Sequence, residues 1–172
     1  NYLRLCPEVH ILVNNTGGPA GGPIIEAESD QFLKTFQMHV INNQFLAQSV
    51  VPSMKKEGFG RIINIISTSV KQPIIGLGVS NTIRGAVASW AKTLSLELGQ
   101  YGITVNNVLP GYTETARLDS VLEMRSKNQG KTQEQVADEL KALIPIRRFS
   151  EAKEVAAAVA FLASPAAGSI SG

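Results

Sequence analysis

Short apolar runs alternate along this chain with longer stretches of helical periodicity, and each run ends at turn-forming residues. The runs span residues 9–13, 61–66 and 104–109. Strands this apolar cannot face water on one side, so they predict buried strands of a parallel sheet. Alternation of such strands with helices predicts an α/β fold, with a doubly wound parallel sheet covered by helices on both faces.

The helical stretches follow from the spacing of apolar residues. A long helix is expected over residues 29–56, with Ser29 as its N-cap, and others over 85–98, 134–143 and 151–162. The predicted order is therefore strand, helix, strand, helix, strand, helix, helix. A length of 172 residues suits one domain with a sizeable core.

Composition excludes several classes of function. Sixteen basic and 14 acidic residues give a net charge of +2, and no basic stripe is present to follow phosphates, so a nucleic-acid partner is not expected. No apolar run approaches the ~20 residues that cross a bilayer, so no membrane association is expected. Cys6 is the single cysteine, which excludes an internal disulfide and fits a cytoplasmic protein.

Ligands of parallel sheets bind beyond the carboxyl ends of the strands. Three turn segments should meet at that edge, at residues 14–17, 67–69 and 110–115. Glycines follow the first strand at Gly17, Gly18, Gly21 and Gly22. They either let the backbone approach a cofactor or simply form turns.

Several long motifs occur in a fixed order: NNTG at 14–17, GRIINIIS at 60–67, AKTLSLELGQYGITVNNVLPG at 91–111, PGxxxT at 110–115 and IPIRRFSEAKEVAAAVAFLASP at 144–165. Together they resemble the short-chain dehydrogenase/reductase family, in particular its 3-oxoacyl-carrier-protein reductase-like members. The resemblance implies a Rossmann-type fold, an NAD or NADP cofactor and hydride transfer to or from a carbonyl or alcohol substrate. It implies cofactor contacts from Asn14, Asn15, Thr16, Gly17, Arg84, Pro110, Gly111, Thr113 and Thr115.

The family pattern begins with a strand, a glycine-rich TGxxxGxG turn and two further strands, whereas Asn1 falls just before its fourth strand. The pattern also continues into a last strand beyond Gly172. We therefore expect residues 1–172 to form a single incomplete Rossmann-type domain without the N-terminal strands and the last strand. Exposed apolar faces should result.

The family uses Asn, Ser, Tyr and Lys in catalysis. Ser67 falls on the serine position, but the tyrosine and lysine positions hold Ser80 and Arg84. The resemblance thus assigns Ser67 to the substrate oxygen, although a serine after a strand can also only close a turn. An alkyl hydroxyl is far less acidic than a phenol of pKa about 10, and arginine binds ribose or phosphate without exchanging protons.

His39 stands where the family has asparagine. One interpretation is a buried helix histidine with a hydrogen-bonded nitrogen. The other is a catalytic residue that faces the site and carries protons, because its ordinary pKa lies near 6.5. Tyr112, beside Pro110 and Gly111, is a further phenol at the expected rim.

Three functions follow from these residues. The first is an NAD(P)-dependent oxidoreductase with an atypical proton path, and the second is a catalytically silent nucleotide-binding or scaffold subunit. The third is an enzyme of different chemistry, such as dehydration, with His39 as the base. Binding of cofactor without turnover would favour the second.

The resemblance also implies a homodimer or homotetramer that pairs through helices 30–56 and 85–98. An apolar stripe on the second helix supports this, although core packing explains it equally well; it comprises Val87, Trp90, Leu94 and Leu98. The charged segment 119–143 is expected to form a lid, with 125–135 less ordered than the sheet.

Overall fold

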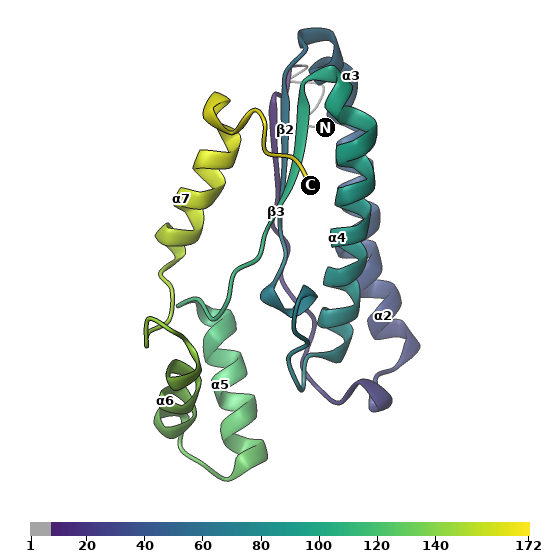
Figure 1. Ribbon diagram of the computed structural model, residues 1–172. Coiled ribbons are helices and arrows are strands. Elements are labelled where there is room, and N and C mark those ends of the chain that lie inside the picture. Colours follow the sequence, from purple (N-terminus) through teal and green to yellow (C-terminus); the bar gives the residue numbers. More distant parts are fainter. Residues whose placement is uncertain (1–7) are drawn as a thin grey trace.

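The computed structural model describes residues 8–172, and a parallel three-stranded sheet forms its centre (Figure 1). The strands are β1 (Ile11–Asn14), β2 (Gly60–Ile65) and β3 (Ile103–Val108), in the order β1-β2-β3. Their carboxyl ends lie at one edge, where Asn14 pairs with Asn64. The predicted α/β class and parallel sheet are confirmed, and each predicted strand differs from the observed one by one or two residues.

One face of the sheet is covered by two long helical segments (Figure 1). The first comprises α2 (Ser29–Phe36), a π-helical turn (Gln37–Ile41) and α3 (Asn42–Glu57), and the second is α4 (Gly78–Leu98). The opposite face carries α7 (Ala152–Ala163). Helices therefore occur on both faces, as predicted.

The main core lies between the sheet, α3 and α4. Its buried side chains form one cluster: Ala47, Val50, Met54, Ile62, Ala91, Leu98, Ile103 and Val105. A second cluster continues toward the strand ends and includes Val40, Ile66, Val79, Ile83 and Val87. Val87 and Leu98, two members of the apolar stripe expected at an interface, thus belong to the core.

The sheet is less well covered at β1 and under α7. Ile11 and Val13 on β1 are 45% and 44% exposed, and α7 has no buried residue. At the other side of the sheet, Val105 donates its N–H to Ser171 Oγ at 3.1 Å and accepts from Gly172 N at 2.8 Å. The last residues therefore lie along the free edge of β3.

Three helical elements differ from the prediction. The first has Glu28 as its N-cap, in a capping box with Gln31, so the expected N-cap at Ser29 was wrong. Helix α4 begins seven residues earlier, at Gly78, whose missing Cβ lets Ile24 lie against the backbone. Residues 119–143 are a helical hairpin of α5 (Ala116–Gln129) and α6 (Gln133–Leu143). A third cluster anchors this hairpin and contains Leu118, Val136, Leu140 and Phe149. All four lie outside residues 125–135, whose lower order stays a prediction.

The remaining helical segments are single 3-10 turns, at Ile24–Glu26, Thr68–Val70, Gly99–Tyr101 and Pro165–Ala167. In residues 8–172, no helix combines the length and the apolar character that a membrane span needs. Cys6, on which the expectation about disulfides rests, lies outside the described residues.

Candidate functional site

A cavity of about 1010 Å³ opens at the carboxyl edge of the sheet. Its walls come from the loops after all three strands and from α4, α5 and α7. It brings together most of the predicted site residues: Asn15, Thr16, Gly17, Ser67, Ser80, Arg84, Pro110, Gly111, Thr113 and Thr115. Asn14 and His39 are the two predicted residues outside its lining.

A row of asparagines lies beneath the cavity. Asn14 Nδ2 donates to Asn64 Oδ1 at 2.8 Å, and Asn64 Nδ2 donates to Asn107 Oδ1 at 3.1 Å. All three occupy paired positions near the strand ends, and Asn14 and Asn64 are almost fully buried. The structure thus gives Asn14 a role in joining the strands. The sequence analysis missed this row, which an alignment of the three predicted strands at their last residues would have suggested.

Arg84 joins the ends of two strands. Its Nη1 donates to the Ile65 carbonyl at 2.6 Å and its Nη2 to the Thr16 carbonyl at 3.2 Å. Burial, together with the positive charge of Arg117, lowers the pKa of Arg84 to about 10, so it stays charged at neutral pH. Arginine can span two carbonyls because its donors form a rigid planar fork.

His39 lies behind the loop after β1. It is 2% exposed and sits in the π-helical turn, a feature often found near functional sites. Its Nε2 lies 3.0 Å from the Gly17 carbonyl, which can only accept, so Nε2 carries the proton. Burial, and secondarily the charge of Arg84, lowers the pKa of His39 to about 4, against the opposing effect of the Gly17 bond. This geometry matches the interpretation of a buried, hydrogen-bonded histidine.

Two serines face the cavity from different elements. Ser67 follows β2, and its Oγ accepts from Ser69 N at 3.1 Å, which leaves its own O–H free to donate. Ser80 lies in the first turn of α4. The ionisable groups among the described lining residues are Arg84, Arg117 and Tyr112. Tyr112 packs edge-on against Phe149, with 6.2 Å between ring centroids.

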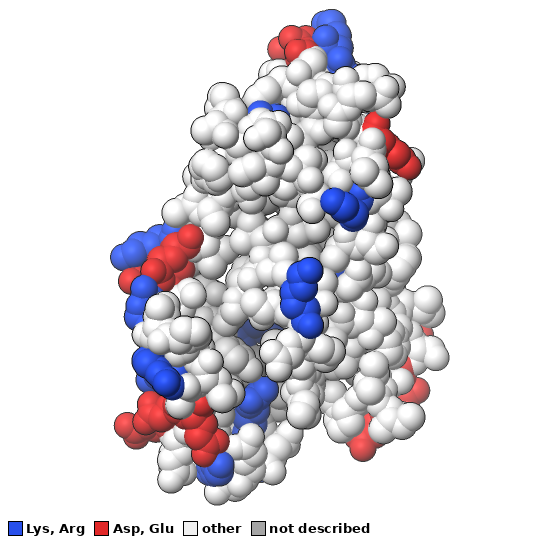
Figure 2. All heavy atoms as spheres, viewed as in Figure 1, with Lys and Arg blue, Asp and Glu red and all other residues white. Residues whose placement is uncertain are grey.

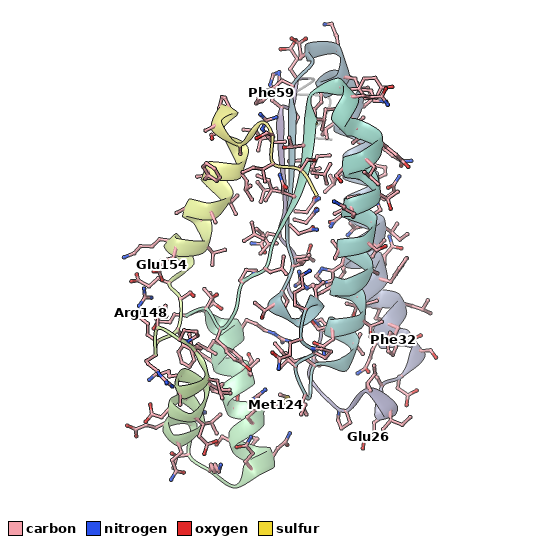
Figure 3. All side chains as sticks on the ribbon, in the orientation of Figure 1. Glu26, Phe32, Phe59, Met124, Arg148 and Glu154 are labelled. Atoms are coloured by element: carbon pink, nitrogen blue, oxygen red, sulfur yellow. The ribbon has the colours of Figure 1, made fainter. Side chains whose placement is uncertain are left out.

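Helix α5 closes the cavity from the side opposite α4. Arg117 lies over Gly18, where an added Cβ would be 3.3 Å from Nη2. Met124, labelled in Figure 3, packs against Gly21, so an added Cβ there would require the Met124 side chain to move. Gly22 N donates to the Gly76 carbonyl at 2.8 Å. The sequence analysis missed Arg117, although it stands only two residues after the PGxxxT motif.

Comparison with known proteins identifies the fold and the motifs around this cavity. A family model described as enoyl-(acyl carrier protein) reductase matches residues 4–172. The chain belongs to the short-chain dehydrogenase/reductase family. The predicted resemblance, with its 3-oxoacyl reductase-like character and Rossmann-type fold, is therefore confirmed.

Individual relatives agree with this assignment. Over 97% of this chain, the sequence is 29% identical to the NADPH-dependent reductase BacG of Bacillus subtilis. Over 96% of this chain, it is 30% identical to the 7alpha-hydroxysteroid dehydrogenase of Escherichia coli. It spans 64% and 60% of the lengths of these two proteins. A crystal structure of a variant actinorhodin polyketide ketoreductase with NADPH superposes with a TM-score of 0.91 at 33% identity, covering 98% of this chain and 66% of that one.

The expectation of a nicotinamide cofactor agrees with that NADPH-containing structure. The cavity fits part of such a cofactor, since Gly17 and Gly111 line it and a Cβ at either would meet open space. Thr113 and Thr115 add hydroxyl groups to the same wall. The TGxxxGxG phosphate-binding pattern does not occur in residues 1–172.

Proposed function

We propose that the protein is an NAD(P)-dependent oxidoreductase of a carbonyl or alcohol substrate, in which no tyrosine–lysine pair carries the proton. The observation that supports it is the cavity itself. It joins the loop at Asn15 to Gly17, Ser67 and the loop at Pro110 to Thr115 in one space. These are the family's cofactor and substrate segments. The positions of the family's catalytic tyrosine and lysine, however, hold Ser80 and Arg84.

The chain's own residues then have distinct tasks. Ser67, with its free O–H, holds the substrate oxygen, while Thr113 and Thr115 orient the nicotinamide. Arg84 keeps the ends of β1 and β2 together and binds the ribose with its remaining donors. The bound cofactor supplies or takes up the hydride. Water in the open cavity exchanges the proton through the Ser67 and Ser80 hydroxyls.

Titration with NADPH and NADH, followed by cofactor fluorescence, tests the binding step. Turnover on a panel of ketones and secondary alcohols then tests the chemistry. Binding with turnover would support the proposal. Absence of binding of either cofactor by the intact protein would contradict it.

Binding without turnover would favour a catalytically silent nucleotide-binding or scaffold subunit, which one observation also supports. Arg84 and His39 are both hydrogen-bonded to backbone carbonyls of the loop after β1, at Thr16 and Gly17. Side chains used in this way stabilise a binding loop without taking part in a reaction. The third function, with His39 as a base, has no comparable support, because His39 lies outside the lining.

We further propose that the protein forms a homodimer or homotetramer through the outer surfaces of α3 and α4. Phe45 and Leu96 are 64% and 75% exposed on these helices. The proposal rests on these exposed side chains, because Val87 and Leu98 of the apolar stripe on the second helix belong to the core. Light scattering that shows a stable monomer at micromolar concentration would contradict it.

A further inference from the structure

The two arginines in the cavity wall have no acidic partner. Arg84 comes from α4 and Arg117 from the first turn of α5, and the described lining contains no Asp or Glu. The ion pairs among residues 8–172 all lie elsewhere. Figure 2 shows Lys or Arg atoms recessed in the hollow beside α5.

Both guanidinium groups keep donors available. Arg84 donates one N–H to the Ile65 carbonyl and one to the Thr16 carbonyl. A guanidinium has five N–H donors in total, so others stay available. Arg117 makes no hydrogen bond within the described part of the chain and is held over Gly18 by packing alone. Each positive charge also acts on the other, as the effect of Arg117 on the Arg84 pKa shows.

Two like charges beside a largely apolar cavity repel one another, and an anion placed between them would remove that repulsion. Arginine suits carboxylate and phosphate groups in particular, because its fork donates two parallel hydrogen bonds to them. The start of α5 adds to this preference, since Thr115 caps it without a side-chain hydrogen bond.

We propose that Arg117 binds a carboxylate or phosphate group of the substrate, and that the positive charge of Arg84 on the opposite wall strengthens the attraction. The substrate class is then an acidic carbonyl compound or alcohol, whose reacting oxygen lies at Ser67. This inference rests on the proposed function, because it names the substrate of the same cavity. Arg117 acts here as a specificity-determining residue, whereas Arg84 also holds the strand ends.

Calorimetry on the intact protein, with and without NADPH, tests the assignment using two matched pairs of probes. Levulinate is compared with its methyl ester, and dihydroxyacetone phosphate with dihydroxyacetone. We expect the acidic member of at least one pair to bind about tenfold or more tightly than the neutral member, as a hydrogen bond to a charged group implies.

The Arg117→Gln variant should abolish this preference, and Arg117→Lys should restore part of it, since a lysine keeps the charge without the fork. Lys127→Gln is the matched control: it removes an exposed positive charge from the same helix, paired with Glu123 in the folded protein, and should leave the preference unchanged. Circular dichroism checks that each variant folds.

Equal affinity for acidic and neutral probes would overturn the assignment, as would an acid preference that survives Arg117→Gln. If Arg117→Gln instead weakens NADPH binding tenfold and leaves the acid preference intact, the arginine contacts the cofactor's pyrophosphate and the assignment to substrate is wrong. If the protein binds neither NADPH nor NADH but still prefers the acidic probes, the anion site is supported and the proposed oxidoreductase function is overturned.

Discussion

The two arginines that border the cavity differ in how the fold uses them. Arg84 on α4 is fixed by two backbone carbonyls at the ends of β1 and β2. Arg117 on α5 is exposed and has no hydrogen-bond partner in residues 8–172. The same type of side chain thus connects two strands on the α4 wall and is available to bind a ligand on the α5 wall. The difference arises because backbone carbonyl groups lie within reach of Arg84, whereas Arg117 has none as a hydrogen-bond partner.

The largest effect is expected from restoring the family's acid on the α4 wall. Ser80→Tyr with Arg84→Lys should create or raise reductase activity on simple ketones by ~10²–10⁴-fold, the usual contribution of general acid catalysis. In the proposed function, Ser67 holds the carbonyl oxygen in the parent and in the variant. The rate of NADPH oxidation measures the gain.

This double variant also loses the two-carbonyl contact of Arg84, so its stability must be measured beside its activity. Ser80→Tyr alone is the control, since it adds the phenol and keeps the arginine. A folded double variant that binds NADPH yet stays at the parent's rate would refute the restoration. An active parent that loses turnover would show that Ser80 and Arg84 belong to a different working mechanism.

Removal of each arginine in turn tests the structural difference between the walls. Arg84→Met should lower the free energy of unfolding by about 2 kcal/mol, because the Ile65 and Thr16 carbonyls lose a charged donor. Arg117→Met should change it by less than about 0.5 kcal/mol, as is usual for exposed positions. Urea unfolding measures both values, and equal losses would contradict the comparison.

His39 supports the loop after β1 in a way that depends on pH. Its folded pKa of about 4 lies below the ordinary value of 6.5, so the unfolded chain takes up a proton first as the pH falls. The stability from His39 is complete above pH ~7 and is lost between pH ~6.5 and ~4. The loss should be roughly 2 kcal/mol, allowing for solvent screening.

His39→Asn, which introduces the residue that the sequence resemblance expects here, separates this effect from other titrating groups. Unfolding in urea at several pH values between 7 and 4 should show a flatter dependence for the variant than for the parent. Identical pH profiles for the two proteins would mean that His39 does not titrate differently in the folded and unfolded states.

Sequence reasoning found the sheet and most of the cavity lining because strand ends and turn residues are local features. Ser67 and Thr115 could be placed from their neighbours alone. The hydrogen bonds of Arg84 and His39 could not, because they join residues separated by 68 and 22 positions in the chain. Periodicity alone also missed α5, since its charged and amide residues concealed the buried anchors Leu118 and Val121.

A smaller loss of stability than at Arg84 or His39 is expected where α5 and α6 meet, at the base of the α5 wall. Thr132 begins α6 with a capping box: its Oγ accepts from Gln135 N at 3.2 Å, and Gln135 Oε1 accepts from Thr132 N at 3.0 Å. Thr132→Ala should therefore destabilise the protein by about 1 kcal/mol. Thr132→Ser keeps the hydroxyl and is the matched control. Because the cap holds only the hairpin, hydrogen exchange should rise in α5 and α6 and stay unchanged in the sheet. An equal rise in hydrogen exchange in β2 and β3 would show that the hairpin and the sheet unfold together. The α4 and α5 walls would then differ only in the contacts of their arginine side chains.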